Sequence, residues 1–299
     1  MKRMYGVVIP MVTPLTEDDH VDVLSLQRLT DFLIDKGVDC LYPCGTTGEM
    51  AYLTDDERIL VVETVVRQAA GRVPVFAQVG AANTSSTIRL AQHAAACGAD
   101  GVGVVTPWYF QLSDDALLSY YKEVSDSVPA DFPIYMYGIP QNAVNDITPA
   151  LAERVAQACP NVVGVKYSYP DMTRLQQLMT VRNGAFDVLV GPDHLYEAVV
   201  AVGGKGVLQG GLGGFRQVVG CHHGHVIVCM DGKEILPDEV VAEEHHDDAD
   251  DDDPLEVIIP PVGPAFLAGV LALFAGLEVF GVDIAFVTVA CHGAVPSKF

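Results

Sequence analysis

The stretch VVGVKYSYP (residues 162–170) places a single lysine, Lys166, in an otherwise apolar run. Val162, Val163 and Val165 predict a buried strand, because continuous runs of β-branched residues are typical of strands covered on both faces. Lysine is rarely buried unless it is paired or functional. The same strand therefore indicates a parallel sheet covered by helices and a candidate functional amine.

Eight runs of this kind occur in the first 210 residues. They predict strands at residues 6–11, 39–43, 74–80, 101–106, 133–138, 162–168, 187–191 and 206–210. The segments between them have apolar residues at helical spacing, which predicts helices at 22–36, 55–70, 84–97, 114–127, 149–158, 172–181 and 193–202. Several of these helices begin near a capping residue, namely Thr54, Thr84, Ser113 and Thr148.

The alternation of strands and helices predicts an α/β fold, and this number of strands and helices is that of a (β/α)8 TIM barrel. A doubly wound sheet is the alternative. Such a sheet usually has fewer strands and a glycine-rich phosphate turn after the first one. Here the first strand runs into PMVTP (residues 10–14), which contains no glycine, so we expect the barrel.

The composition of the 299-residue chain argues against some classes of function. Half of the residues are hydrophobic, which is enough for a sizeable core. The formal net charge of −22 argues against nucleic acid and against an anionic membrane surface as partners, because both favour clustered lysine and arginine. Seven scattered cysteines form no disulfide framework and suggest a reducing cytoplasm. The N-terminus fits a first strand better than a signal peptide.

The last third of the chain differs in composition from the rest. Residues 1–210 hold 14 basic and 24 acidic residues, a net of −10, and residues 211–299 hold 3 and 15, a net of −12. Most of the later acids lie near 231–256, an acidic low-complexity segment of a kind that is usually disordered. The apolar segment that follows is short for a membrane span, so we interpret it as buried, with membrane contact as the alternative. We expect a barrel core over 1–210 and a C-terminal region of uncertain fold over 211–299.

Active sites of such barrels lie at the C-terminal ends of the strands, and this rule selects CGTTGE (residues 44–49), TPWYF (106–110), YMYGIP (135–140), Lys166 and GPDH (191–194). Lys166 has no acid near it in sequence, and burial would keep part of its amine neutral and able to form a Schiff base with a carbonyl. Tyr137 lies at the end of the fifth strand, but taken alone it is better explained as a half-buried core tyrosine whose hydroxyl bonds to the backbone. GTTGE (residues 45–49) is a turn with hydroxyls and free N–H groups that suits a carboxylate, or an ordinary strand-to-helix turn.

Together, GTTGE (45–49), YGIP (137–140) and GVK (164–166) resemble the dihydrodipicolinate synthase / N-acetylneuraminate lyase family over roughly residues 5–210. That family consists of class I, pyruvate-handling aldolases on a (β/α)8 barrel. The resemblance implies that Lys166 forms an imine with the keto carbon of pyruvate or of another 2-oxo acid.

The resemblance also implies roles for the residues around that imine. Tyr137 would be the proton shuttle, with Thr46 beside it in a hydroxyl relay. Thr47 and the neighbouring backbone amides, Gly45 included, would hold the pyruvate carboxylate. Tyr109 would cross a tight dimer interface and complete the relay of the neighbouring subunit. The acceptor side would be lined by Gly191, Asp193 and Val207.

The implied reaction needs no cofactor and no metal, because the protonated imine on Lys166 serves as the electron sink. Loss of a methyl proton gives an enamine that adds to an aldehyde, and the reverse reaction cleaves a 2-oxo-4-hydroxy acid to pyruvate. The expected partners are therefore pyruvate or another 2-oxo acid, an aldehyde acceptor, and further copies of this chain in a homotetrameric dimer of dimers. The histidines of CHHGH (residues 221–225) match no structural zinc spacing.

Departures from the family pattern bear on the substrate. In the synthase branch an arginine follows the tyrosine by five residues and clamps the carboxylate of aspartate semialdehyde. This chain has Asn142 there, and an amide cannot replace a bidentate guanidinium. Asp55 and Thr87 replace the histidine and glutamate that bind feedback lysine in some synthases. Ser168 matches a hydroxyl residue of the sialate-lyase branch, and Asp193 suits a polyhydroxylated substrate.

Tyr167, Tyr169 and Pro170 depart from both branches, and we expect them to narrow or reshape the acceptor pocket. We favour an aldolase or lyase that condenses or cleaves pyruvate with an aldehyde, on substrates of the 2-oxo sugar acid type. The alternatives are a dihydrodipicolinate (4-hydroxy-tetrahydrodipicolinate) synthase and a catalytically silent, pyruvate-binding family member. The family pattern ends near Gly210, and a change of reading frame is one hypothesis for residues 211–299, which intact mass and resequencing would test.

Overall fold

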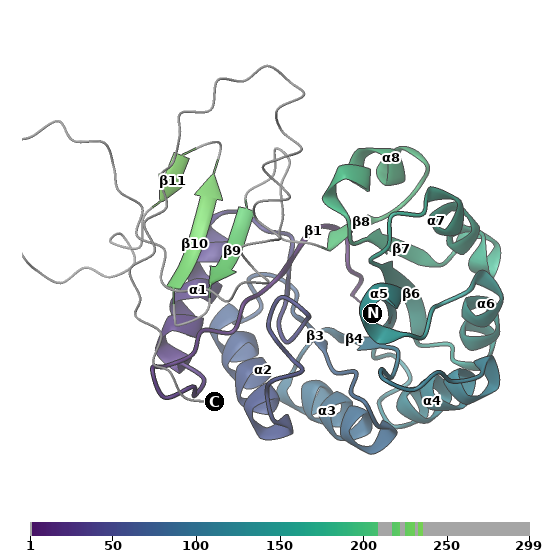
Figure 1. The fold of residues 1–299 in the computed structure, drawn as a ribbon, viewed down its shortest axis with the longest axis horizontal. Helices are drawn as coiled ribbons and strands as arrows, with labels where there is room; N and C mark the ends of the chain where they lie inside the picture. The colour runs from purple at the N-terminus through teal and green to yellow at the C-terminus, as the bar shows by residue number, and fades with distance from the viewer. Residues whose placement is uncertain (1, 209–216, 222–224, 231–232, 236–299) are drawn as a thin grey trace, which may run out of the picture. The chain divides into compact units, whose positions relative to one another are not determined.

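A computed structural model of the chain describes residues 2–208, 217–221, 225–230 and 233–235. Eight parallel strands form a nearly closed barrel in the order β2-β1-β8-β7-β6-β5-β4-β3 (Figure 1). The strands are β1 (Gly6–Pro10), β2 (Cys40–Tyr42), β3 (Phe76–Gln78), β4 (Gly101–Val105), β5 (Ile134–Gly138), β6 (Val162–Tyr167), β7 (Asp187–Val190) and β8 (Gly206–Leu208). Each boundary lies within two residues of the predicted one, and the predicted (β/α)8 barrel is confirmed.

Helices surround the strands (Figure 1). They are α1 (Val23–Asp35), α2 (Asp55–Ala69), α3 (Thr84–Cys97), α4 (Asp114–Asp126), α5 (Pro140–Ala143), α6 (Pro149–Ala158), α7 (Met172–Met179) and α8 (Tyr196–Ala201), with the 3-10 turns η1 (Val181–Gly184) and η2 (Asp193–Leu195). The sequence did not predict α5, because four residues are too few to show a helical period. The start of α8 is later than predicted because η2 occupies the residues before it.

The two edges of the sheet meet between β2 and β3. Leu41 pairs in parallel with Val75, just before β3 begins, and its N–H donates to the carbonyl of Pro74 at 3.0 Å. Further along the same pair of strands, the N–H of Gln78 donates to the carbonyl of Pro43 at 3.0 Å. These bonds close the ring, so the C-terminal ends of all eight strands open at one mouth.

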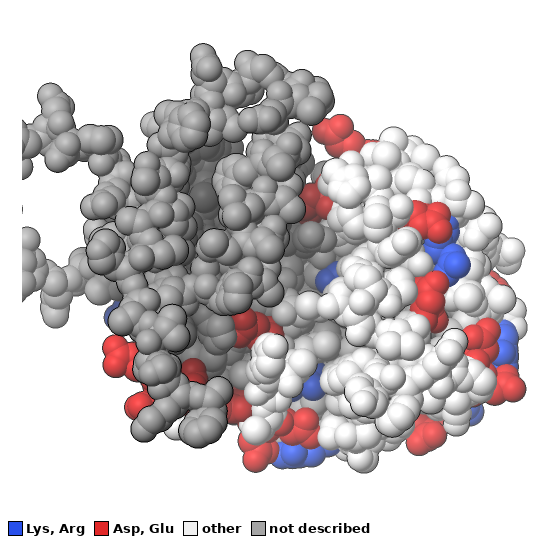
Figure 2. Space-filling view, viewed as in Figure 1, with Lys and Arg blue, Asp and Glu red and all other residues white. Residues whose placement is uncertain are grey.

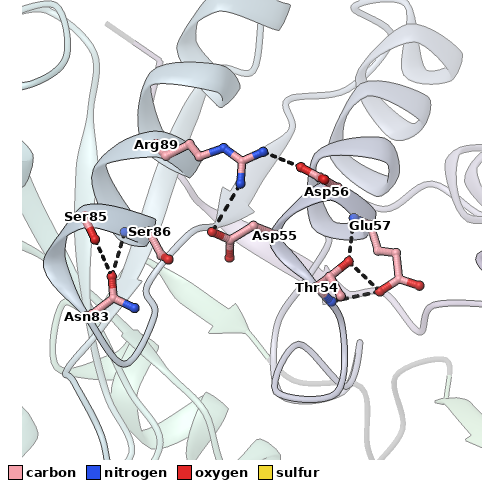
Figure 3. A network of polar contacts seen from close by, with 8 residues as sticks. All are labelled: Thr54, Asp55, Asp56, Glu57, Asn83, Ser85, Ser86 and Arg89. Atoms are coloured by element: carbon pink, nitrogen blue, oxygen red, sulfur yellow. Dashed lines mark hydrogen bonds and ion pairs between the residues drawn. The ribbon is translucent and has the colours of Figure 1, made fainter.

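Polar caps fix the residues at which α2 and α3 begin (Figure 3). The hydroxyl of Thr54 accepts the N–H of Glu57 at 3.3 Å, and Glu57 accepts the N–H of Thr54 at 2.8 Å, which is a capping box. The predicted cap of α3, Thr84, is wrong by one residue. Asn83 is the cap, because its side-chain oxygen accepts the N–H of Ser86 at 2.8 Å and leaves Thr84 as the first helical residue.

Arg89 joins these two helices across the surface (Figure 3). Its guanidinium lies 3.5 Å from Asp55 Oδ2 and also pairs with Asp56, so both acids at the start of α2 face one cation of α3. Exposed pairs of this kind add little stability, but they fix how Asp55 is oriented.

The barrel interior is filled by large aromatic side chains that lie against glycines. The rings of Phe76 and Tyr135 meet edge to face with centroids 5.6 Å apart, and Tyr42 belongs to the same interior cluster. A Cβ atom at Gly101 would overlap the ring of Phe76, and one at Gly103 would overlap Tyr42. The glycines of β4 are therefore required by the close approach of side chains from β2 and β3.

A polar cluster closes the N-terminal end of the barrel. Asp187, the first residue of β7, accepts hydrogen bonds from the hydroxyl of Tyr135 at 2.8 Å and from the guanidinium of Arg3 at 2.9 Å. The N–H of Met4 donates to the Tyr135 hydroxyl at 3.0 Å. Because the N-terminal segment covers this end, the opposite end, where the strands finish, is the one at which a site is expected.

Three further strands follow in the described part of the last third. They form an antiparallel sheet of β9 (Gln217–Cys221), β10 (His225–Met230) and β11 (Lys233–Ile235), with β10 in the middle. The acidic and apolar segments predicted after residue 235 lie outside the described residues. Among the helices that the structure describes, none is long and apolar enough to cross a membrane.

Charges of both signs are mixed on the barrel surface. Figure 2 shows acidic and basic side chains next to one another along the edge of the described face, beside a broad uncharged area. Lys122 pairs with Asp126 at 2.5 Å, and Arg154 pairs with Asp115 at 2.5 Å. This face therefore differs from the clustered basic surfaces that bind nucleic acid.

Candidate active site

Tyr137 and Lys166 lie side by side at the C-terminal ends of β5 and β6. They are partners in the register of these parallel strands, so both side chains point to the inner face of the barrel. Lys166 is 5% exposed, and its Nζ lies 4.1 Å from the ring centroid of Tyr137 and 5.4 Å from that of Tyr42. None of the ion pairs among the described residues includes Lys166. The site is thus built around a buried amine that faces two aromatic rings.

The hydroxyl of Tyr137 connects this amine to other polar groups. Tyr137 Oη and Thr46 Oγ1 form a hydrogen bond of 3.1 Å between the end of β5 and the turn after β2. Burial on its own raises the pKa of Tyr137, but the charge of Lys166 and hydrogen bonds with Thr46, Lys166 and Ser168 outweigh it and hold the pKa below its usual value. A phenol in these surroundings gives up its proton more readily than a free tyrosine, which suits a proton shuttle.

The loop that follows β1 packs against the GTTGE turn and holds it in place. The hydroxyl of Thr13 donates to the carbonyl of Gly48 at 2.8 Å, and a Cβ atom on Gly48 would come within 2.8 Å of the carbonyl oxygen of Met11. Within the turn, the Glu49 N–H donates to the Thr46 carbonyl at 3.0 Å. The Thr46 and Thr47 N–H groups donate to no group in the described part of the chain, and remain available to an anion.

Ser168 lies next to this centre, just after β6. It is 8% exposed, and its side chain helps to hold the pKa of Tyr137 below its usual value. A Cβ atom at Gly191, at the end of β7, would overlap the Ser168 side chain, so only glycine fits there while Ser168 keeps its place. The Gln141 side chain donates to the Ser168 carbonyl at 2.8 Å and fixes the backbone at the strand end.

Other candidates from the sequence lie further from the amine. Tyr109 is 78% exposed, has a φ of 80° and stacks edge to face on Phe110 with centroids 4.9 Å apart, so within this chain it does not reach Tyr137. Asn142 is exposed on α5, and Asp193 is half-buried at the start of η2.

The structure shows which way two residues expected at the acceptor side point. Val207 packs in the core between the strands and the helices, whereas its neighbour Leu208 belongs to the interior cluster. Tyr167 likewise faces the helices, and its hydroxyl donates to Asp146 at 3.4 Å. Both orientations have one cause: side chains alternate along a strand, so the residues next to Lys166 and Leu208 point away from the inner face of the barrel.

Three further residues that were not predicted from the sequence lie inside the barrel or beside the cluster of Tyr137. Tyr42 is fully buried inside the barrel, and Trp108 packs against the apolar cluster that contains Tyr137. Gln78 is fully buried on β3, where its amide nitrogen contacts the sulfur of Met50 and its amide oxygen has no hydrogen-bond partner among the described residues. Strand alternation is the signal that could have identified Tyr42, which lies on the inner face of β2 two residues after Cys40.

Comparison with known proteins agrees with this geometry. The model of the dihydrodipicolinate synthetase family matches residues 3–211. A 4-hydroxy-tetrahydrodipicolinate synthase from Acidiphilium cryptum (strain JF-5) is 40% identical over 205 residues, which make up 69% of this chain and 69% of that protein. The family match ends just after β8, close to the point where the sequence pattern itself ends.

Solved structures are similar over the same part of the chain. The crystal structure of YagE, a prophage protein of the dihydrodipicolinic acid synthase family from E. coli K12 in complex with pyruvate, has a TM-score of 0.67 and 32% identity over 70% of each chain. A 2-keto 3-deoxygluconate aldolase from Picrophilus torridus has a TM-score of 0.65 and 28% identity over 69% of this chain and 74% of that one.

Proposed function

This chain belongs to the dihydrodipicolinate synthetase family, whose members are lyases, and we propose that it joins pyruvate to a hydroxylated aldehyde, or cleaves the product, through an imine on Lys166. The main support is the buried Lys166 amine against Tyr137, whose hydroxyl is bonded to Thr46. The pyruvate complex of the E. coli prophage protein supports pyruvate as the first substrate.

In the proposed first step the pyruvate carboxylate binds at the turn of Thr46 and Thr47, whose N–H groups are available to an anion. The neutral amine of Lys166 attacks the keto carbon, and a C–N bond forms as the carbonyl electrons move onto oxygen. The nitrogen gives up one proton, and the oxygen takes up that proton and one more and leaves as water, so that a protonated imine remains. The hydroxyl of Tyr137 is the group placed to move these protons.

The carbon–carbon bond forms in the second step. The protonated imine withdraws electrons, so the methyl group loses a proton and an enamine results. The enamine carbon attacks the aldehyde carbon, whose oxygen takes up a proton. Water then hydrolyses the imine, frees the Lys166 amine and releases a 2-oxo-4-hydroxy acid. The reverse sequence cleaves the same acid to pyruvate and the aldehyde.

The acceptor end of the site favours hydroxyl groups over a carboxylate. Asn142 offers an amide where the synthase pattern has an arginine, and an amide cannot form the paired charged bonds that a guanidinium makes. Ser168 and Asp193 add a hydroxyl and a carboxylate near the strand ends. The aldolase from Picrophilus torridus, named for a deoxy sugar acid, is a structural neighbour with such a substrate.

A second candidate function is that of the curated relatives, 4-hydroxy-tetrahydrodipicolinate synthase. The identity of 40% favours it, and Asn142 argues against it. A catalytically silent family member that binds pyruvate is a third possibility.

The feedback region of the synthases is filled here by the chain's own contacts. The Thr87 side chain is fully buried, and its hydroxyl bonds to the N–H of Ala81 at 3.0 Å and to the hydroxyl of Tyr120 at 3.1 Å. Asp55 faces Arg89 (Figure 3). Neither residue has the side chain with which the histidine and the glutamate of the regulated synthases bind lysine. We therefore propose that free lysine does not inhibit this enzyme.

The exposed Tyr109 supports assembly. Tyr109 and Phe110 form an exposed aromatic pair, and exposed aromatic residues are typical of protein–protein interfaces. We propose that Tyr109 enters the site of a second copy in a dimer of dimers. A cytoplasmic location stays a prediction from the cysteine usage.

A panel of acceptors tests the proposed function. Pyruvate is incubated with the full-length protein and either a hydroxylated aldehyde, such as glyceraldehyde, or aspartate semialdehyde, and its consumption is followed. We expect faster consumption with the hydroxylated aldehyde. Consumption with aspartate semialdehyde alone would establish the synthase reaction, and pyruvate binding without any consumption would establish the silent member.

A further inference from the structure

Tyr42 is the second aromatic residue beside the catalytic lysine. Its ring centroid lies 5.4 Å from the Nζ of Lys166, inside the range of about 6 Å over which a cation is attracted to a ring face. The ring of Tyr137 lies 4.1 Å from the same atom. No ion pair among the described residues involves Lys166, so its charge meets these two ring faces and the hydroxyl of Tyr137.

Packing, rather than a hydrogen bond, holds the Tyr42 ring in place. Its hydroxyl is buried and has no hydrogen-bond partner in the described part of the chain. The far end of the side chain lies over Gly103, where a Cβ atom would overlap it, and the ring edge lies 3.4 Å from a Cβ placed on Gly45. A buried hydroxyl without a partner is costly, so the hydroxyl does not explain why Tyr42 is present. What the residue contributes at this position is its ring, which phenylalanine would also supply.

We propose that the ring of Tyr42 is a positioning element for imine formation: it holds the Lys166 side chain against Tyr137 and stabilises the positive charge that develops on Nζ. This inference rests on the proposed function. When the neutral amine attacks the keto carbon, its lone pair forms the C–N bond and the nitrogen becomes cationic. The charge remains on the protonated imine after water has left. A ring face favours these cationic states over the neutral attacking amine, so the rates are compared on the alkaline plateau of the pH profile, where the resting amine is neutral.

Rapid trapping tests the proposal. The protein is mixed with increasing pyruvate, quenched with borohydride after increasing times, and the adduct is quantified by intact mass. In Tyr42→Leu we expect the maximum rate of imine formation to fall roughly 10-fold, the size expected for a buried cation–ring contact. The half-saturating pyruvate concentration should not change, because the turn at Thr46 and Thr47 is untouched. Tyr42→Phe keeps the ring and should stay within about twofold of the wild type.

Two further variants keep the test decisive. Phe76→Leu removes an aromatic ring from the same interior cluster, but one that lies against Gly101 and Tyr135, so it should leave the trapping rate unchanged. Tyr42→Met fills more of the space than Tyr42→Leu does, also without a ring, and should trap pyruvate at the same reduced rate. It takes the place of Tyr42→Leu in the test if the leucine variant does not fold.

The outcomes separate the two proposals. If the wild type traps pyruvate and the leucine or methionine variant traps it at the same maximum rate, the role of Tyr42 is refuted. A Tyr42→Phe variant as slow as Tyr42→Leu, or a Phe76→Leu variant slowed to the same extent, refutes it as well. If the wild type forms no adduct at all, the proposed function itself fails.

Discussion

Tyr137 and Lys166 occupy one register position on adjacent parallel strands, and the Nζ of Lys166 lies 4.1 Å from the ring centroid of Tyr137. Paired residues on neighbouring strands point to the same face, with their backbones about 4.8 Å apart. The amine and the phenol are therefore brought together by the sheet itself. A site on strands is held more rigidly than one on loops, so substitutions here should alter chemistry more than fold.

Removing the phenol should disable proton transfer while leaving the barrel folded. For Tyr137→Phe we expect the turnover number for pyruvate consumption to fall about 100-fold or more, the usual contribution of a positioned acid–base group. Tyr121→Phe is a matched control, because Tyr121 is also fully buried but donates to the carbonyl of Val104, outside the site. Turnover of Tyr137→Phe within a few-fold of the control would count against the shuttle.

The lowered pKa of Tyr137 should depend on its neighbours. Lys166→Met removes a positive charge and Thr46→Val removes a hydrogen bond, so each should raise the pKa of Tyr137. Ultraviolet difference titration of tyrosinate, with Tyr137→Phe as the blank, measures this shift. No shift in Lys166→Met would contradict the electrostatic coupling.

The same shift has a consequence for stability. The pKa of Tyr137 is lower in the folded than in the unfolded chain, where it is about 10. The linked stabilisation is therefore complete above the unfolded value and is lost as the pH falls through the folded value. In Lys166→Met this pH-dependent part of the unfolding free energy should become smaller.

Two tyrosines inside the barrel should respond differently to loss of their hydroxyls. The Tyr135 hydroxyl donates to Asp187 and accepts from Met4, so Tyr135→Phe should lower the unfolding free energy by about 1–3 kcal/mol. The Tyr42 hydroxyl has no partner among the described residues, so Tyr42→Phe should cost nothing or stabilise. Chemical denaturation of both variants compares them. Equal losses would show that the Tyr42 hydroxyl has a partner.

Asn142 should determine which aldehyde is accepted. Asn142→Arg introduces a guanidinium on α5, so we expect the ratio of kcat/KM for aspartate semialdehyde over that for a hydroxylated aldehyde to rise by about 10-fold or more. Asn142→Gln keeps the amide and should leave that ratio unchanged. An unchanged ratio in the arginine variant would show that residues other than Asn142 select the acceptor.

The sequence predicted the barrel and the core of the site because both depend on local pattern. Runs of valine and isoleucine marked the strands, and once Tyr137 and Lys166 ended consecutive strands, their adjacency followed from parallel pairing. Thr46 was placed beside them by resemblance, and its 3.1 Å bond to Tyr137 agrees with that.

Orientation and long-range packing were harder to predict. Val207 was assigned to the acceptor side by its position along β8, but alternation turns its side chain to the helices. The Asn83 cap was missed because Thr84, next to it, is also a capping type. The contact of Tyr42 with Lys166 joins β2 to β6 across the interior and needs Gly103 on β4 to make room, and no local pattern encodes that combination.

The most direct test of the account is covalent trapping of pyruvate. The full-length protein is incubated with pyruvate, reduced with borohydride, digested and mapped by mass spectrometry, beside a Lys166→Arg variant and a sample without pyruvate. The account predicts that one reduced pyruvyl group is added, on the peptide that contains Lys166, and that none is added in the variant or without pyruvate. No adduct on the wild type, or an adduct on another lysine, would contradict it.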